Sequence, residues 1–162
     1  MTPHKTYRSA ADFRRSLEDR LRDIARKEAV DLQRIRREVA FDRLLVRLFR
    51  GQRPDKLPWA LKGGYAMELR IRSARATRDI DLAFRVADPA DAADDTLLQK
   101  LQEAAAVDVN DFFVYIIGEP IADLDAAPYG GSRFPVEAHV DGRPLVRFHL
   151  DVGVGGRGNR AA

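Results

Sequence analysis

Two neighbouring segments constrain the fold of this chain more than any other part of its sequence. The first is Lys62-Gly63-Gly64-Tyr65, which follows a short apolar run, and the second is residues 78–84. Residues 78–84 alternate between apolar and polar side chains, as a half-buried strand does. A glycine pair permits a sharp turn and a close approach of the backbone to a ligand. The order strand, glycine turn, helix and strand predicts an α/β architecture.

Two carboxylates, Asp79 and Asp81, lie in the second strand and are separated by one residue. Successive side chains of a strand point to opposite faces, so both carboxylates lie on the same face. They repel each other unless a cation lies between them, and carboxylate oxygens suit magnesium. The backbone of Gly63 and Gly64 can approach a phosphate beside a helix N-terminus. Together these features predict phosphoryl or nucleotidyl transfer, whereas a solvated edge strand is the simpler explanation of the carboxylates taken alone.

Hydrophobic periodicity and turn signals place the remaining elements. Two amphipathic helices are expected at 9–27 and 31–50, with Ser9 and Asp31 as N-caps. The turn Asp141-Gly142 predicts a hairpin. In chain order, we expect strands at 57–61, 78–84, 112–117, 132–140 and 144–152, helices at 65–72 and 90–106, and a loop at 118–130. This arrangement is an α/β (α+β) fold with a mixed sheet and an N-terminal helical layer.

The 162-residue chain is long enough for one compact domain with a core. We expect a helical layer at 1–53, a catalytic core at 54–152 and a disordered Gly/Arg tail at 153–162. The sequence contains no apolar run of membrane-spanning length, no signal-peptide pattern and no cysteine. Disulfides and thiolate metal sites are therefore excluded, and we predict a cytoplasmic protein with no membrane partner.

Charge is unevenly distributed, although the net charge is only +3. Residues 1–53 contain 15 Lys and Arg against 8 Asp and Glu, whereas residues 86–141 contain 2 against 12. An arginine-rich segment can contact the phosphates of a nucleic acid or nucleotide, and the expected helices at 9–50 could approach RNA in this way. On charge alone, a solvated helical face is the simpler explanation. A DNA-binding module at 9–50 is a weaker alternative, because the spacing of a helix-turn-helix is missing.

From about residue 40 to residue 152, the sequence resembles the nucleotidyltransferase toxins of abortive-infection and type IV toxin–antitoxin systems. These toxins belong to the DNA polymerase β-like nucleotidyltransferase superfamily. The resemblance is carried by Leu61-Lys62-Gly63-Gly64-Tyr65-Ala66, by Arg75-Ala76-Thr77-Arg78-Asp79-Ile80-Asp81 and by Leu150-Asp151-Val152. The glycine turn and the Asp-x-Asp strand are each common, but their combination is fairly specific.

The resemblance implies a set of site residues and a cofactor. The catalytic and metal-binding residues would be Asp79, Asp81 and Asp151, with Mg²⁺ as the cofactor. The nucleotide-binding residues would be Lys62, Gly63, Gly64 and Tyr65, the two glycines acting through their backbone. Asp151 would help to activate the acceptor hydroxyl or complete a second metal site.

The resemblance also implies an activity and partners. Such a toxin moves a nucleoside monophosphate from a nucleoside triphosphate to an RNA, in some cases transfer RNA, or to a protein. It acts in a toxin–antitoxin or phage-defence system and pairs with an antitoxin protein. Family members usually carry a further helical domain with an arginine-aspartate-x-x-aspartate motif, which this sequence lacks. The alternative is a truncated, catalytically inactive nucleotidyltransferase-like protein that binds nucleotide, RNA or a partner protein.

Overall fold

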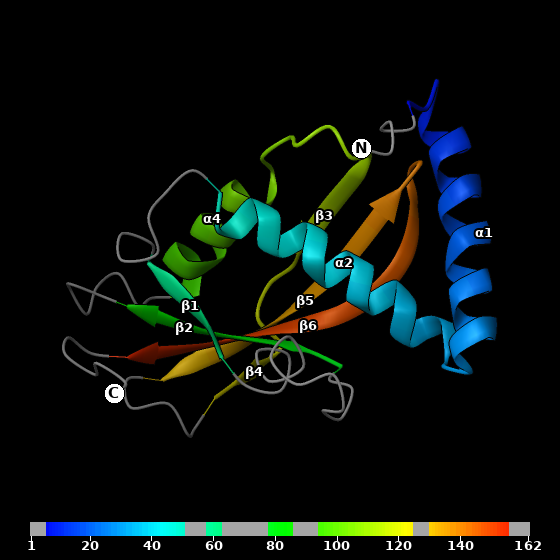
Figure 1. The fold of residues 1–162 in the computed structure, drawn as a ribbon. Helices are drawn as coiled ribbons and strands as arrows, with labels where there is room; N and C mark the ends of the chain where they lie inside the picture. Colours follow the sequence, from blue (N-terminus) through cyan, green and yellow to red (C-terminus); the bar gives the residue numbers. More distant parts are fainter. Residues whose placement is uncertain (1–5, 51–57, 63–77, 86–93, 125–129, 156–162) are drawn as a thin grey trace.

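The computed structural model describes residues 6–50, 58–62, 78–85, 94–124 and 130–155, and the structural statements below concern these residues. They form helices and the strands of a single sheet (Figure 1). In chain order the elements are α1 (Ala10–Glu28), α2 (Leu32–Leu48), β1 (Trp59–Lys62), β2 (Ile80–Arg85), α4 (Asp94–Ala105), β3 (Phe113–Ile117), β4 (Ala122–Asp123), β5 (Gly131–Val140) and β6 (Arg143–Gly155).

The sheet is mixed, as the sequence predicts. Its strand order is β1-β2-β6-β5-β3, and β4 also pairs with β5. The β2–β6 pair is parallel, whereas β1–β2, β5–β6, β3–β5 and β4–β5 are antiparallel. The hairpin β5–β6 forms at the predicted turn, where Asp141 and Gly142 both have positive φ angles, 57° and 69°. Consequently, β6 returns from the hairpin to lie between β5 and β2 in the middle of the sheet.

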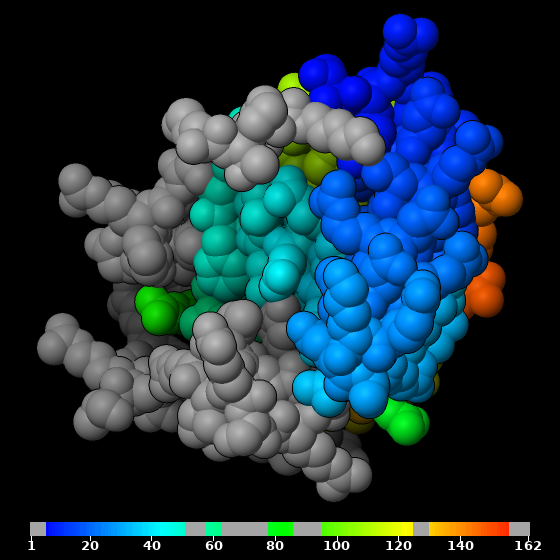
Figure 2. Space-filling model, turned by 45° about the vertical axis from the view of Figure 1, so that its right-hand side comes forward, coloured from blue at the N-terminus to red at the C-terminus, as the bar shows by residue number. Residues whose placement is uncertain are grey.

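The two N-terminal helices begin where their capping residues predict. The Ser9 side chain accepts a hydrogen bond from the Asp12 backbone N–H, and Asp31 accepts one from the Gln33 backbone N–H. Each bond satisfies a donor that the first turn of a helix leaves unpaired. Figure 2 shows α1 and α2 packed side by side on one side of the molecule. The predicted N-terminal helical layer is therefore present.

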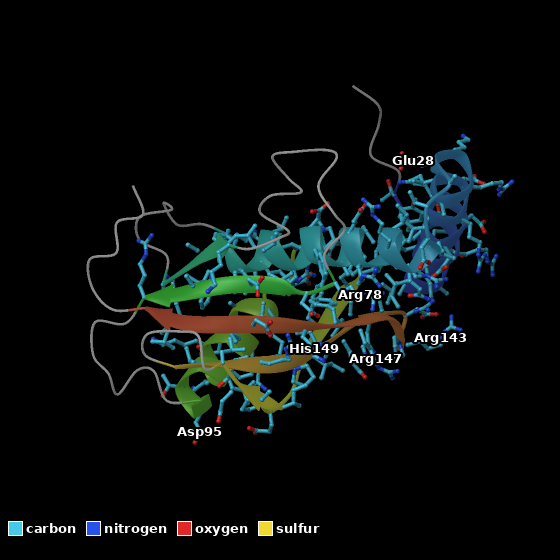
Figure 3. All side chains as sticks on the ribbon, turned by 90° about the horizontal axis from the view of Figure 1, so that it is seen from below. Glu28, Arg78, Asp95, Arg143, Arg147 and His149 are labelled. Carbon is cyan, nitrogen blue, oxygen red and sulfur yellow. The ribbon has the colours of Figure 1, made fainter. Side chains whose placement is uncertain are left out.

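One face of the sheet is buried against helices, and α2 and α4 both lie on that side (Figure 1). Alternate residues of β2 point into this core, and Ile80, Leu82 and Phe84 are at most 1% exposed. The same alternation buries Leu150 and Val152 in β6. The intervening polar residues of both strands are therefore displayed on the opposite face, which we call the open face. Figure 3 views the molecule from below, toward the open face.

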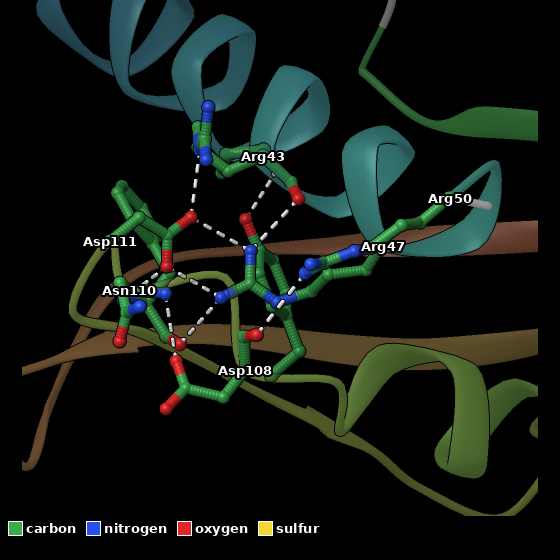
Figure 4. Close-up of polar contacts among 9 residues, drawn as sticks. Arg43, Arg47, Arg50, Asp108, Asn110 and Asp111 are labelled. Carbon is green, nitrogen blue, oxygen red and sulfur yellow. Dashed lines mark hydrogen bonds and ion pairs between the residues drawn. The ribbon is translucent and has the colours of Figure 1, made fainter.

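A buried ion pair fastens the start of β3 to α2 (Figure 4). The Arg47 side chain is 1% exposed, and its Nη1 and Nη2 donate to the two Asp111 carboxylate oxygens at 2.8 and 2.6 Å. Nη2 also donates to the Phe113 carbonyl at 2.9 Å, and Arg43 Nε donates to Asp111 at 2.7 Å. Hydrogen bonds of this kind compensate for the desolvation of both charges.

The same network supports a backbone that is otherwise unfavourable. Asn110 and Phe112, on either side of Asp111, have φ angles of 55° and 65°. Asparagine tolerates this left-handed region, but a bulky aromatic residue rarely adopts it. The Phe112 ring stacks on Phe13 of α1 with ring centroids 5.1 Å apart. Packing and the Asp111 network therefore hold this segment in place together.

Several boundaries differ from the sequence prediction. The expected loop at 118–130 contains the short strand β4, because Ala122 and Asp123 pair with β5. The tail expected at 153–162 begins as strand, since β6 continues through Gly155 beside β2. The helix expected at 65–72 lies outside the described residues. None of the described helices combines the length and apolar character that crossing a membrane requires.

Candidate active site

Four charged residues form one row across four adjacent strands of the open face. Lys62 of β1 is the register partner of Asp81 in β2, and Asp81 is the partner of Asp151 in β6. Asp151 is in turn the partner of Arg133 in β5. Register partners on neighbouring strands present their side chains on the same face, close enough to interact. The row therefore reads positive, negative, negative, positive, with two carboxylates at its centre. We call it the charged row.

Asp79 lies one step along the open face from the charged row. Its Oδ1 accepts a hydrogen bond from the His149 backbone N–H at 3.0 Å and lies 3.3 Å from His149 Nδ1. Asp79 and Asp81 share a face, as their spacing predicts, because the intervening Ile80 is fully buried. Asp79 thus also links β2 to β6. His149, labelled in Figure 3, marks this side of the charged row.

The electrostatics of Asp81 indicate a shortage of positive charge at the centre of the row. Partial burial raises the pKa of the Asp81 carboxyl above its usual value of 3.8, and the nearby charge of Asp151 raises it further. Lys62 and Arg133 lower the pKa, but their effect is smaller. A carboxyl with a raised pKa is one whose anionic form lacks compensation. A bound cation would supply that compensation.

Asp151 is compensated differently. Arg133 Nε and Nη2 donate to its two carboxylate oxygens at 2.8 and 2.9 Å, which is a bidentate ion pair. The hydrogen bonds to Asp151 and its charge raise the pKa of the Arg133 guanidinium. The Asp151 side chain is only 13% exposed, so this pair is partly shielded from water. Such a geometry is stronger than that of an ordinary surface ion pair.

The donor set of the charged row fits a hard divalent cation. Asp81 and Asp151 offer neighbouring carboxylate oxygens, the ligands that magnesium prefers, and Asp79 is the next carboxylate on the same face. Within the described part of the chain, no three His, Asp or Glu side chains are already grouped to hold a metal ion. Asp79 and Asp151 instead contact His149 and Arg133. Metal binding therefore requires these contacts to change.

The structure brings together part of the predicted site. Asp81, Asp151 and Lys62 are neighbours in one row, with Asp79 beside them. The predicted nucleotide-binding residues Gly63, Gly64 and Tyr65 lie outside the described residues.

Sequence reasoning missed Arg133, whose partner depends on a β-bulge. The hairpin pairs His139 with Pro144 but Ala138 with Val146, so Leu145 is an extra residue in β6. A one-residue shift of this kind exchanges the faces of every following side chain. Without it, the turn at Asp141-Gly142 would pair Arg133 with Leu150. Two consecutive apolar residues, Leu145 and Val146, are the only sign of this bulge in the sequence.

The basic helices do not surround the charged row. The face of the sheet that α2 covers is the one opposite the open face, and many arginines of α1 and α2 are already paired. Arg36 contacts Glu18 at 2.6 Å, and Arg43 and Arg47 contact Asp111. Part of the N-terminal positive charge is thus neutralised by carboxylates within the protein.

Comparison with known families decides the classification. The model of a family described as nucleotidyl transferase AbiEii toxin of type IV toxin–antitoxin systems matches residues 43–161. The matched segment includes every strand of the sheet and all four residues of the charged row. The chain belongs to the AbiEii family. The resemblance seen in the sequence is therefore confirmed. No curated protein matches the chain.

Membership of the AbiEii family makes this chain a toxin nucleotidyltransferase. It implies a nucleoside triphosphate as substrate and an antitoxin as partner. The charged row lies within the AbiEii match, on the sheet face that no described helix covers. It is the candidate active site.

Proposed function

We propose that this AbiEii protein is a magnesium-dependent nucleotidyltransferase that moves a nucleoside monophosphate from a nucleoside triphosphate to a hydroxyl group of RNA, transfer RNA included, or of a protein. In this proposal the protein acts as a toxin in phage defence. The observation that carries the proposal is the direct pairing of Asp81 with Asp151 on adjacent parallel strands, flanked by Lys62 and Arg133. Two partly buried carboxylates placed side by side repel each other, and a bound cation would relieve that repulsion.

In the proposed reaction, the acceptor hydroxyl oxygen forms a bond to the α-phosphorus. The bond from that phosphorus to the oxygen bridging to the β-phosphate breaks, and pyrophosphate leaves with the bonding electrons. The acceptor proton passes to a nearby base, for which Asp151 is the candidate. Asp81 and Asp151, with Asp79, would hold magnesium. When bound, this ion would neutralise phosphate charge and favour the deprotonated acceptor.

Lys62 has a defined place in this proposal. It is exposed, ends β1 and is the register partner of Asp81. It also immediately precedes Gly63 and Gly64 in the sequence, where the phosphates are expected. A lysine there can balance the charge of the triphosphate and of the pyrophosphate that leaves. We therefore assign one end of the triphosphate to the β1 side of the charged row.

An RNA acceptor is supported by an exposed basic side chain on the same face as Asp151. Arg147 lies four residues before Asp151 in β6, and its side chain is 70% exposed although its Nε donates to Glu137 at 2.6 Å. His149 lies between them along the open face (Figure 3). An exposed guanidinium can contact a phosphate without reading sequence.

A second candidate function is that of an inactive protein that binds nucleotide, RNA or a partner without chemistry. The observation in its favour is that Asp151 and Asp79 already contact Arg133 and His149. A protein that had lost catalysis would retain these contacts as structural ones.

The test is transfer of each α-³²P-labelled nucleoside triphosphate to total RNA and to total protein, with and without magnesium. Asp81→Asn removes a central carboxylate charge at nearly constant volume. Asp95→Asn makes the same change on α4, away from the charged row, and is the matched control. We expect labelling by the wild type and by Asp95→Asn, and a loss of at least about a hundredfold in Asp81→Asn. Labelling by Asp81→Asn at the wild-type level would contradict the proposal. Metal-dependent triphosphate binding without any labelling would establish the inactive protein instead.

A further inference from the structure

Arg133 occupies both carboxylate oxygens that a divalent cation would need from Asp151. Its Nε and Nη2 each donate to a different oxygen, at 2.8 and 2.9 Å. The two parallel hydrogen bonds from the guanidinium engage the lone pairs of the carboxylate oxygens that face it. A metal ion that binds Asp151 must therefore displace at least one of these hydrogen bonds.

The Arg133–Asp151 pair depends on a specific feature of the backbone. The bulge at Leu145 puts Arg133 opposite Asp151 and turns both side chains toward the open face. On its other side, Arg133 has Ala122 of β4 as register partner. Of the two register partners of Arg133 within the described sheet, Asp151 is the acidic one. If the Arg133 guanidinium leaves Asp151, no second carboxylate lies directly opposite Arg133 on a neighbouring strand.

We infer that Arg133 and the divalent cation compete for Asp151, and that the guanidinium released from Asp151 binds the triphosphate of the nucleotide. This inference rests on the proposed function. The fork that matches a carboxylate also matches a phosphate, and arginine binds both in a bidentate manner. Arg133 and Lys62 lie at opposite ends of the charged row, so the triphosphate would meet a cation on each side of the metal-binding carboxylates.

Competition and release have opposite consequences for two ligands. Replacing Arg133 with glutamine removes the cation that competes for Asp151, so a divalent cation alone should bind more tightly. The same replacement removes a phosphate-binding group, so a polyphosphate should bind more weakly. A residue with only a structural role would weaken the binding of both ligands or of neither.

The experiment measures binding rather than turnover. Mn²⁺ alone is titrated into the protein and free Mn²⁺ is followed by electron paramagnetic resonance. Tripolyphosphate is then titrated calorimetrically at saturating Mn²⁺. For Arg133→Gln we expect Mn²⁺ affinity to rise about threefold to tenfold and tripolyphosphate affinity to fall about tenfold, the range of one charge-assisted contact. Arg133→Lys, which keeps the charge but not the fork, should lie between these values and the wild type.

Two controls isolate the contact from a general change in charge. Arg143→Gln removes one exposed positive charge from β6 without touching Asp151, and it should leave the affinity for Mn²⁺ within about twofold of wild type because exposed charges are screened. In an Asp151→Asn background, Arg133→Gln should no longer raise Mn²⁺ affinity, because the shared carboxylate is gone. Thermal unfolding of each variant checks that the fold is retained.

The possible failures are distinguishable. If the wild type binds Mn²⁺ but Arg133→Gln weakens both ligands or changes neither, the inference is overturned and the proposed function stands. The inference is overturned in the same way if Arg133→Gln still raises Mn²⁺ affinity in the Asp151→Asn background. If the wild type binds neither Mn²⁺ nor tripolyphosphate, the proposed function and the inference fail together.

Discussion

Asp81 and Asp151 are direct register partners on the parallel strands β2 and β6, although one precedes α4 in the chain and the other lies near the end of the hairpin. Each is flanked across the sheet by a basic residue, Lys62 or Arg133. This relationship concentrates like charge at one place in a sheet whose other face is apolar. Its consequences for stability are measurable separately from its consequences for activity.

Asp81→Asn should stabilise the metal-free protein. The substitution removes a partly buried charge that Asp151 repels, and like charges on opposite strands cost about 0.5–1 kcal/mol. The measurement is the free energy of unfolding in urea with a chelator at pH 7.5, with Asp95→Asn as the control. Burial raises the pKa of the Asp81 carboxyl in the folded protein above its unfolded value of 3.8. The free energy of unfolding therefore falls as pH rises from 3.8 through the folded pKa, because the folded state must then hold the charged form. The gain should therefore vanish below about pH 3.8, and a gain that persists there would show a different cause.

Asp111→Asn should strongly destabilise the protein at neutral pH. The variant leaves the buried Arg47 guanidinium without a counter-ion, at a cost of about 3 kcal/mol. Burial alone would raise the pKa of Asp111, but hydrogen bonds from Arg47, Arg43 and the Phe113 backbone N–H lower it below 3.8. Because the folded pKa is the lower one, this stabilisation is present above pH 3.8 and is lost as pH falls through the folded pKa.

The check for Asp111 is urea unfolding of wild type and variant across pH 3–8. The difference between them should be largest near neutral pH and should shrink in acid. Asp108→Asn, which changes a nearby exposed carboxylate, is the control. A difference that stays constant with pH would exclude the charge of Asp111 as the cause.

Arg14→Ala should loosen the contact between α1 and the hairpin. The Arg14 guanidinium donates to the backbone carbonyls of Val140, Arg143 and Pro144 at 2.7, 2.9 and 3.0 Å. Losing a charged donor to several carbonyls costs about 1.5–3 kcal/mol. Native-state hydrogen exchange should show reduced protection in α1 with little change in the β2–β6 pair. Arg15→Ala, an exposed neighbour on α1, should leave exchange unaltered; equal loss of protection in both variants would contradict the assignment.

Ile116→Lys should reduce self-association. Val114 and Ile116 of β3 are 60% and 49% exposed on the last strand of the sheet order, and Ile121 nearby is 59% exposed. Apolar side chains on an edge strand favour pairing with another chain, and a lysine there opposes it. Light scattering against concentration should show a smaller apparent mass for the variant. Identical concentration dependence in the two proteins would argue that this edge does not associate.

The elements and the paired carboxylates of β2 follow from the sequence because they depend on local patterns. Ser9 and Asp31 cap the helices that they precede, Asp141-Gly142 makes the hairpin turn, and period-two alternation separates Ile80 from Asp81. Each of these effects acts over a few residues, so a single sequence reveals it. The short strand β4 was not predictable, because two residues carry no period and pair only once β5 is in place.

Local patterns along the chain were enough to specify the α/β class, the mixed sheet with an N-terminal helical layer, and the carboxylates of the candidate site. Which of those carboxylates become neighbours, and what neutralises them, depends on the folded arrangement. Parallel pairing of β2 with β6 places Asp81 beside Asp151, and the bulge at Leu145 places Arg133 on Asp151. The first depends on the register between strands that are far apart in the chain and the second on the position of the bulge, and both are set by how the whole apolar face packs against α2 and α4. Apart from the apolar pair Leu145 and Val146, local patterns contain no record of that choice.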